Sequence, residues 1–416
     1  MPPSDPVRDQ YEDLPYPPRD PADEARRLIT GSPSHLDELN HYVFAGARDL
    51  ARPFRALVAG GGTGDAAIML AQQLADRGGP AEVVYLDLSA ASRAIAEKRA
   101  QVRGLANLSF HTGSLLDVAA IAPGPFDYID CCGVLHHLDD PAAGLAALTG
   151  VLAPAGGMGL MLYGALGRTG VYDMQEMLRR LAPAAPDAED RTAENRAGRI
   201  ARARRLIAAL PPTNRFRRNP FLSDHVDAGD AGLYDLLLHA RDRAYRVPEI
   251  VDLLAGAGLA PTGFVEPARY DPATYLSAPA LLKPLAGMGW LDRAALAELL
   301  AGNLRSHAFY AVPAARAAAA VARPDPSAVP VLRDMDGPAA AKGLGAGGAI
   351  TADLDGVAAR FPLPARATAI LARIDGRRSL ADIAADLGLD WSAFAKAFAP
   401  LYRALNGLNK LYLRRD

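Results

Sequence analysis

Cysteine and tryptophan are scarce in this chain of 416 residues, which contains only two of each. The two cysteines, Cys131 and Cys132, are adjacent and lie in an apolar segment. Neighbouring cysteines cannot build an ordinary disulfide framework, and two thiols without partner ligands make a poor metal site. We interpret them as buried, unreactive thiols, so the sequence predicts neither a disulfide scaffold nor a cysteine-bound metal.

Excess charge and long apolar runs are absent as well. The chain has 45 basic and 47 acidic residues, a net charge of −2, which argues against bulk electrostatic attraction to nucleic acid. No uncharged apolar stretch reaches the length of about 18 residues that a membrane span needs. Residues 1–20 are polar and proline-rich and lack the apolar core of a signal peptide. We therefore predict a cytoplasmic protein without a membrane or nucleic-acid partner.

The most informative segment that is present is a glycine loop, residues 59–65, which reads AGGGTGD. An apolar run precedes it at residues 56–58, and an amphipathic stretch follows at residues 66–75. A strand, a glycine loop and a helix in this order place bare backbone and free helix N–H groups at the carboxyl edge of a sheet. The loop therefore predicts a site for a nucleotide-type cofactor.

The next predicted strand, residues 82–86, ends in Asp87, which Leu88 follows. A carboxylate at this place can accept hydrogen bonds from both ribose hydroxyls of an adenosine group. Two cofactor classes remain open at this point. Gly62, Gly64 and Ala67 can be aligned with a dinucleotide fingerprint, whereas Gly60, Gly62 and Gly64 fit the G-x-G-x-G loop of an S-adenosylmethionine (SAM) site.

Three further segments continue the pattern of alternating strands and helices. Residues 108–117 predict a third strand that ends in a polar turn, suited to the rim of an adenine pocket. Residues 126–141, FDYIDCCGVLHHLDDP, predict a buried fourth strand, an exit of small residues and a double histidine. A helix at residues 145–152 and a turn at residues 154–157 lead to a fifth strand, Met158 to Tyr163.

In this order and spacing, residues 54–165 resemble the class I SAM-dependent methyltransferases, particularly through VLHHLDDP and the turn LAPAGG. The resemblance implies a Rossmann-like α/β sheet with helices on both faces and SAM as the cofactor. The cofactor-binding residues it implies are Gly60, Gly61, Gly62, Gly64, Asp65, Asp87, Leu88, Ser114, Leu115, Cys132 and Gly133. It also makes His136, His137 and Tyr163 candidate catalytic groups beside the methyl acceptor. The alternative is that the histidines only begin a helix and pack against the cofactor.

Two positions depart from the pattern of that family. Val58 stands where these enzymes usually carry an acid that helps to hold the methionine end of the cofactor, and Ser114 stands where an aspartate often accepts from the adenine amino group. We expect the amino group of the cofactor to find another partner, either Asp65 or a residue of the N-terminal segment.

The segments around the core predict further parts. Residues 1–53 form an N-terminal lid segment, extended through its prolines at residues 11–21, with Ser34 as a helix N-cap. The candidate lid residues are Tyr16, Arg19, His41 and Tyr42. Residues 166–247 form a substrate-recognition insert with helices at residues 171–181 and 189–210. Its candidate acceptor residues are Asn219, Asp224, His225 and His239, whose spacing matches no paired helical metal motif, so we predict no metal.

Residues 248–312 return to the methyltransferase pattern, and residues 313–349, rich in alanine, proline and glycine, predict a linker. Residues 350–416 predict three helices, at residues 364–374, 379–387 and 391–406, and a closing strand. This arrangement looks like a winged-helix module and is similar to the C-terminal tails of some bacterial methyltransferases, including protein-lysine methyltransferases. The predicted third helix holds only two basic residues, which disfavours DNA binding.

Three functions remain open. The first is methyl transfer to a protein side chain or peptide, the second is methyl transfer to a small metabolite, and the third is SAM binding without catalysis. A closed apolar pocket would favour the small molecule, and an open acidic or aromatic groove would favour the protein. The sequence makes no prediction of the oligomeric state.

Overall fold

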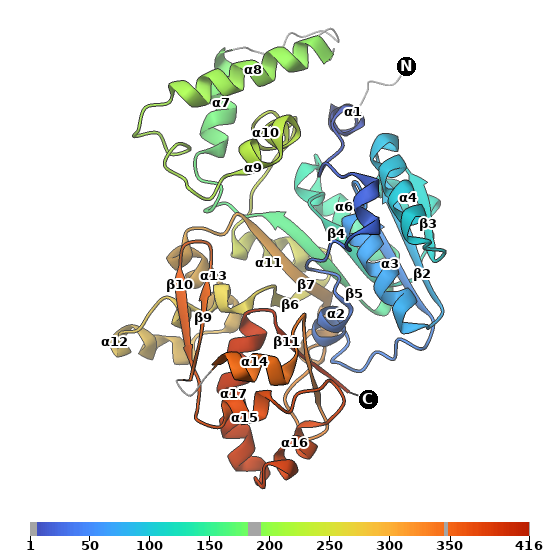
Figure 1. Ribbon diagram of the computed structural model, residues 1–416. Helices are drawn as coiled ribbons and strands as arrows, with labels where there is room; N and C mark the ends of the chain where they lie inside the picture. Colours follow the sequence, from blue (N-terminus) through green and yellow to red (C-terminus); the bar gives the residue numbers. More distant parts are fainter. Residues whose placement is uncertain (1–5, 182–192, 345–347, 416) are drawn as a thin grey trace.

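The computed structural model describes residues 6–181, 193–344 and 348–415. Within them, a seven-stranded sheet has the order β3-β2-β1-β4-β5-β7-β6 (Figure 1). The strands are β1 (Phe54–Ala59), β2 (Ala81–Asp87), β3 (Leu108–Thr112), β4 (Phe126–Cys132), β5 (Leu152–Tyr163), β6 (Leu259–Phe264) and β7 (Ser306–Pro313). Strands β1 to β5 are parallel to one another, and β7 runs antiparallel to both β5 and β6. The predicted Rossmann-like α/β fold is confirmed.

The strands form because their side chains are apolar on both faces of the sheet, as expected for buried parallel strands. One face packs on α6 (Pro141–Gly150), α11 (Val247–Gly256) and α13 (Trp290–Ala301), in a core that joins Leu57 and Ile129 to Ile250. The other face packs on α2 (Leu36–Val43) and α3 (Asp65–Arg77), in a core that joins Val58 to Leu39. Helix α4 (Ala90–Arg103) follows β2 and precedes β3.

The strand order reverses between β1 and β4, because β2 and β3 lie on one side of β1 while β5 lies beyond β4. In open α/β sheets, a crevice forms at this switch point outside the carboxyl ends of the strands. The sheet topology therefore fixes where a ligand can bind before any side chain is considered.

The prolines at residues 11–21 predict an extended segment, but the first three of these residues belong to a helix. Residues Pro6–Asp13 form helix α1, which lies between α10 (Gly229–Leu237) and the end of the sheet (Figure 1). Pro6 occupies the first turn, where no backbone N–H is needed, and Pro15, Pro17 and Pro18 come after the helix. Tyr11 is thereby placed on a helix rather than on an extended strand.

Ser34 does not cap helix α2. The helix begins at Leu36 with His35 at the N-cap and no side-chain cap. Ser34 has a φ of 85°, and its hydroxyl group lies 2.5 Å from Oδ2 of Asp130 and 2.9 Å from the hydroxyl oxygen of Tyr128. The hydroxyl group is therefore hydrogen-bonded to side chains of β4 and does not cap the helix.

The insert forms a separate layer of helices beyond the carboxyl ends of the strands, drawn in green in Figure 1. It contains α7 (Val171–Leu181), α8 (Ala193–Ala209), the short α9 (Asp224–Asp227) and α10, around a core that includes Met174, Phe216 and Leu233. Residues 189–192 of the predicted second helix lie outside the described residues.

The predicted linker is folded. It contains a 3-10 helix (Ala314–Ala319), strand β8 (Val329–Leu332) and helix α14 (Gly337–Leu344). Some of its alanines are core residues, since Ala320, Ala322, Ala328 and Ala341 are buried. A bias toward small residues therefore reflects close packing here and not a flexible connection.

The C-terminal unit combines a hairpin, three helices and a final strand. These are β9 (Ala349–Asp353), β10 (Ala358–Pro362), α15 (Ala367–Leu371), α16 (Leu380–Asp386), α17 (Trp391–Gly407) and β11 (Leu411–Arg414). Strand β11 pairs antiparallel with β8, which joins the former linker to this unit. Its assignment as a winged helix remains a prediction. No helix in the described part of the chain is long and apolar enough to cross a membrane.

Helix α2 holds the C-terminal unit against the sheet. Glu38 is fully buried and accepts hydrogen bonds from Arg333 at 2.7 Å and from Tyr412 at 3.1 Å. His41 accepts from the backbone N–H of Leu413 at 3.0 Å, and Tyr42 stacks on Tyr310. The lid candidates His41 and Tyr42 therefore lie in this interface and do not cover a ligand site.

We predict that His41 makes the protein sensitive to acid. Burial lowers its pKa to about 4, whereas an exposed histidine in the unfolded chain has a pKa of about 6.5. Stability from this group is complete above pH 6.5 and is lost as the pH falls toward the folded pKa. At pH 5 the loss should be about 2 kcal/mol.

The measurement is the free energy of unfolding at pH 7 and pH 5 for the native chain and for His41→Gln. Glutamine can accept the Leu413 N–H but does not titrate. The variant should lose about 2 kcal/mol less than the native chain. Equal losses in the two proteins would contradict the assignment.

Candidate functional site

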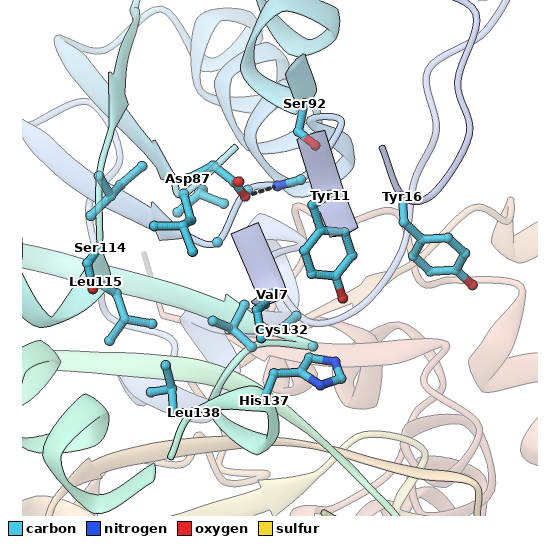
Figure 2. Close-up of a pocket in the computed structure, with 18 of the residues that line it drawn as sticks. Val7, Tyr11, Tyr16, Asp87, Ser92, Ser114, Leu115, Cys132, His137 and Leu138 are labelled. Carbon is cyan, nitrogen blue, oxygen red and sulfur yellow. Dashed lines mark hydrogen bonds between the residues drawn. The ribbon is translucent and has the colours of Figure 1, made fainter. Parts of the chain in front are cut away.

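A cavity of about 770 Å³ lies at the switch point of the sheet. It is built from the loops after β1 to β4, from the end of β5, from α1 and the segment that follows it, and from α10. Figure 2 shows Tyr11, Asp87 and His137 around it. The predicted site residues that line it are Gly60, Gly61, Gly62, Asp65, Asp87, Leu88, Ser114, Leu115, Cys132, Gly133, Tyr16, His137 and Tyr163. The topology thus brings most of the expected cofactor residues together.

The glycine loop needs glycine for two separate reasons. Gly60 and Gly62 have φ values of 77° and 51°, a region that side chains rarely adopt. A Cβ atom on Gly60 would also lie 2.2 Å from Val134, and one on Gly61 would lie 2.3 Å from Tyr85. Gly64 is the N-cap of α3 and does not line the cavity. The loop therefore presents backbone atoms to a ligand.

Asp87 lies at the end of β2 beside this loop. Its Oδ2 accepts from the N–H of Gly62 at 2.7 Å, and its Oδ1 accepts from the N–H of Ser89 at 2.8 Å (Figure 2). Burial raises its pKa, and these two backbone hydrogen bonds partly offset the rise. Each carboxylate oxygen can accept further hydrogen bonds, so Asp87 can hold the hydroxyl groups of a ribose.

Apolar side chains surround the neighbouring part of the cavity. Leu88 follows β2, Leu115 follows β3, and Leu138 follows the double histidine. The hydroxyl group of Ser114 accepts from the N–H of Leu116 at 3.2 Å and closes the turn after β3. This apolar slot with a hydroxyl group at its edge is suited to a flat aromatic base.

Asp65 does not have a free carboxylate. Arg19 donates to it at 2.9 and 2.6 Å, and Arg99 donates at 2.7 Å. Burial raises the pKa of Asp65, but the hydrogen bonds and charges of the two arginines outweigh it and lower the pKa overall. Arg19, a lid candidate, therefore acts on the loop through Asp65 and does not line the cavity.

Arg99 is a residue that the sequence did not single out. It is completely buried, donates to Glu24 at 2.8 and 2.6 Å, and donates to the carbonyl oxygen of Thr63 inside the glycine loop at 2.7 Å. It thereby ties the N-terminal segment to the loop. An arginine in an amphipathic helix is usually solvated, so no local signal indicated this role.

A hydrogen-bonded cluster forms the part of the cavity beside α10, away from the glycine loop. The hydroxyl groups of Tyr11 and Tyr163 donate to Oδ1 and Oδ2 of Asp235, each at 2.9 Å. Asp235 is buried, and no ion pair joins it to a cation among the described residues. Tyr163 is a predicted residue, whereas Tyr11 and Asp235 were missed because they meet across 224 positions of sequence.

His137 is held in one tautomer. Its Nδ1 lies 2.7 Å from the carbonyl oxygen of Arg241, and because a carbonyl only accepts, Nδ1 must carry the proton. The neutral ring then has its lone pair on Nε2. His137 lines the cavity close to Tyr11, whose ring centre lies 6.5 Å from its own (Figure 2). This is the arrangement of a group that can take a proton from a ligand.

His136 has a different environment. Both of its ring nitrogens are buried without a hydrogen-bond partner, and the ring stacks on Tyr163 with centres 3.8 Å apart. Burial, followed by the nearby His137 and Arg168, holds its pKa well below the usual value. His136 does not line the cavity, so it supports Tyr163 as a neutral packing group.

His239 lies next to the cluster but does not line the cavity. Its Nδ1 accepts from the N–H of Arg241 at 3.0 Å, so its Nε2 carries the proton that faces the hydroxyl oxygen of Tyr11 at 3.3 Å. Burial lowers its pKa to about 2. Of the four insert residues predicted from the sequence, it is the one placed near the cavity.

Three of these side chains are also potential metal ligands. Among the described residues, His137, Asp235 and His239 offer ligand atoms within 4.8 Å of one another. The lone pair of His239 is already used by a backbone N–H, and both oxygens of Asp235 accept from tyrosines. We interpret the group as a hydrogen-bonded cluster and not as a metal centre.

The remaining insert candidates serve the insert itself. Asn219 donates to the carbonyl oxygens of Gly167 and Thr169 at 2.9 and 3.1 Å. Asp224 begins α9, and His225 packs on Phe216 with ring centres 5.2 Å apart. These polar side chains were predicted to face an acceptor because they cluster in a loop, but they organise the local chain instead and do not line the cavity.

Comparison with known proteins agrees with the geometry. Residues 57–158 match the model of a family described as "Methyltransferase domain". Over 273 aligned positions, which cover 63% of this chain and 60% of the relative, the chain is 34% identical to the uncharacterized protein syc1184_c of Synechococcus. A 114-residue stretch, 27% of this chain, is 38% identical to a tRNA 5-carboxymethoxyuridine methyltransferase of Escherichia coli, and covers 41% of it. The chain thus spans less than two thirds of these relatives.

Among solved structures, PKMT2 from Rickettsia typhi in complex with AdoHcy aligns with a TM-score of 0.58 and 16% identity. The alignment covers 99% of this chain and 77% of that one, so the two proteins share a fold that includes the C-terminal unit. The sheet and the cavity at its switch point agree with the methyltransferase-domain model that residues 57–158 match.

Proposed function

We propose that this protein transfers a methyl group from SAM to an amine nitrogen on a protein side chain or peptide. The observation that carries the proposal is the buried Asp235, which has no cationic partner among the described residues and lies in the same cavity as His137. An anion and a proton acceptor beside a cofactor site suit a substrate that enters as a cation and must lose a proton.

The cofactor half of the proposal rests on the part of the cavity next to β1 and β2. Asp87 would hold the ribose, the backbone of residues 60–62 would border the amino-acid tail, and the slot around Leu115 would hold the adenine. When bound, SAM supplies a methyl group on a sulfonium centre, which an acceptor can displace in line. AdoHcy is bound by PKMT2, which has the same fold.

The acceptor half rests on charge. A substrate ammonium group would offset the buried charge of Asp235, and the rings of Tyr11 and Tyr163 would contribute cation–π attraction. Nε2 of His137 would then accept a proton from the ammonium group, which frees the nitrogen lone pair for attack. A neutral alcohol or thiol would leave the charge of Asp235 uncompensated.

A protein acceptor is supported by the two extra units that flank the core, the insert and the C-terminal unit. The name of PKMT2, whose fold covers nearly all of this chain, denotes a protein-lysine methyltransferase. One observation favours a small amine instead: α1 and the segment with Tyr16 form part of the cavity wall, as expected of a site that surrounds a small molecule. We also propose that the C-terminal unit is a winged-helix module.

The test uses SAM with a tritiated methyl group and a lysate of the source strain that lacks this gene. Label in a protease-sensitive fraction would support the protein acceptor, and label confined to small molecules would overturn it in favour of a metabolite. Alkaline treatment separates the chemistries, because N-methyl groups survive it whereas methyl esters release volatile methanol. Volatile label would therefore contradict the amine.

A further inference from the structure

The acid that is missing from β1 is present on the adjacent strand. Val58 of β1 and Asp130 of β4 are directly paired in the parallel register of the sheet. Both residues line the cavity, and they lie beside the glycine loop, since Gly60 and Asp130 line the same space. A carboxylate at residue 130 therefore reaches nearly the place that an acid at residue 58 would occupy, because paired strands are only about 4.8 Å apart.

Most other carboxylates of the cavity are committed to protein groups. Asp65 is bound by two arginines, and Asp87 accepts two backbone N–H groups. Asp139 pairs with Arg241, and Asp140 caps helix α6 through the N–H groups of Ala142 and Ala143. None of these four carboxylates has both the position and the free charge to bind a ligand cation near the loop.

Asp130 differs from them in its surroundings. It is 2% exposed, and its Oδ2 accepts from the hydroxyl group of Ser34 at 2.5 Å and from the thiol of Cys132 at 3.6 Å. No hydrogen bond to its Oδ1 and no ion pair to its carboxylate occur among the described residues. Burial raises its pKa to about 6. A buried carboxyl group without a cation is costly unless a ligand supplies the positive charge.

We propose that Asp130 binds the α-ammonium group of the amino-acid part of the cofactor, in place of an acid at position 58. The proposal rests on the proposed function, because it presumes SAM as the cofactor. Ser34 positions the carboxylate through Oδ2 and leaves Oδ1 for the ligand. The N-terminal segment thus contributes to this site through Ser34 and not through a charged side chain.

Calorimetry with two ligands tests the proposal. S-adenosylhomocysteine carries the amino acid, whereas 5′-methylthioadenosine has the same nucleoside and thioether without it. Asp130→Asn should weaken S-adenosylhomocysteine about 10- to 100-fold, the loss expected when a charged hydrogen bond is removed, and should change methylthioadenosine less than about threefold. Asp127→Asn, on the same strand and bound to the N–H of Arg55, is the matched control and should alter neither affinity.

A second variant shows whether a loss of affinity comes from the missing carboxylate or from misfolding. Val58→Asp combined with Asp130→Val moves the carboxylate back to β1, and this exchange should restore most of the affinity that Asp130→Val loses. Equal effects of Asp130→Asn on both ligands, or no effect on either, would overturn the proposal. If the native chain binds neither ligand, the proposed function fails instead, so the two failures are distinguishable.

Discussion

Replacing His137 with glutamine is expected to slow methyl transfer by about 10²- to 10⁴-fold, the usual contribution of a positioned general base. Glutamine keeps the size and polarity of the side chain and can donate to the carbonyl oxygen of Arg241, as Nδ1 of His137 does at 2.7 Å. It cannot accept a proton from an ammonium group. The affinity for S-adenosylhomocysteine should therefore change less than about threefold, because this group would act on the acceptor and not on the cofactor.

The measurement combines single-turnover rates with calorimetry for the native chain and the variant. His111→Gln, on β3 and outside the cavity, provides the same substitution as a control and should keep the native rate. A native single-turnover rate in His137→Gln would show that this residue does not act as a general base. It would also favour an acceptor that enters without a proton to lose.

Replacing Arg99 with alanine is expected to destabilise the fold by about 3–5 kcal/mol. The guanidinium group is 1% exposed and is the common partner of Glu24, Asp65 and the carbonyl oxygen of Thr63. Its removal leaves the carboxylate of Glu24, which is 2% exposed, with Arg103 as its one remaining cationic partner in the described part of the chain. Breaking one side of a buried ion pair is costly because the remaining charge loses its compensation.

The free energy of unfolding by denaturant measures this effect, and Arg93→Ala on the same helix is its matched control. Arg93 pairs with Glu97, but both side chains are about one-third exposed, so its loss should cost no more than about 1 kcal/mol. The Arg99 variant should also bind S-adenosylhomocysteine more weakly, because the glycine loop loses a fixed contact. Similar costs for the two variants would show that the buried network adds little.

Local patterns predicted the sheet and the cofactor half of the site. The strands were predictable because they are apolar on both faces, and the loop because Gly60 and Gly62 adopt conformations that disfavour other residues. Asp87 followed from its place at the end of β2. Each of these features is encoded within a few residues, so the sequence around it carries enough information.

The parts of the site that the sequence did not predict depend on contacts between distant segments. Tyr11 and Asp235 are far apart in the chain, and nothing near either residue indicates that they meet. Likewise, the sequence indicated Asp65 as a partner for the amino group of the cofactor, but two arginines bind Asp65. Asp130, which we propose in its place, lies on the strand that neighbours Val58. The first contact depends on how two helices pack and the second on the strand order, and short-range patterns reveal neither.

Helix α1 touches both halves of the cavity. The carboxylate of Glu12 accepts from the N–H groups of Ala90 and Ala91, at the start of the helix that follows Asp87, while Tyr11 reaches Asp235. Helix α1 therefore connects the part of the cavity beside Asp87 with the part beside Asp235. A displacement of this helix would expose both parts to solvent at once, so neither part would be opened alone in that way.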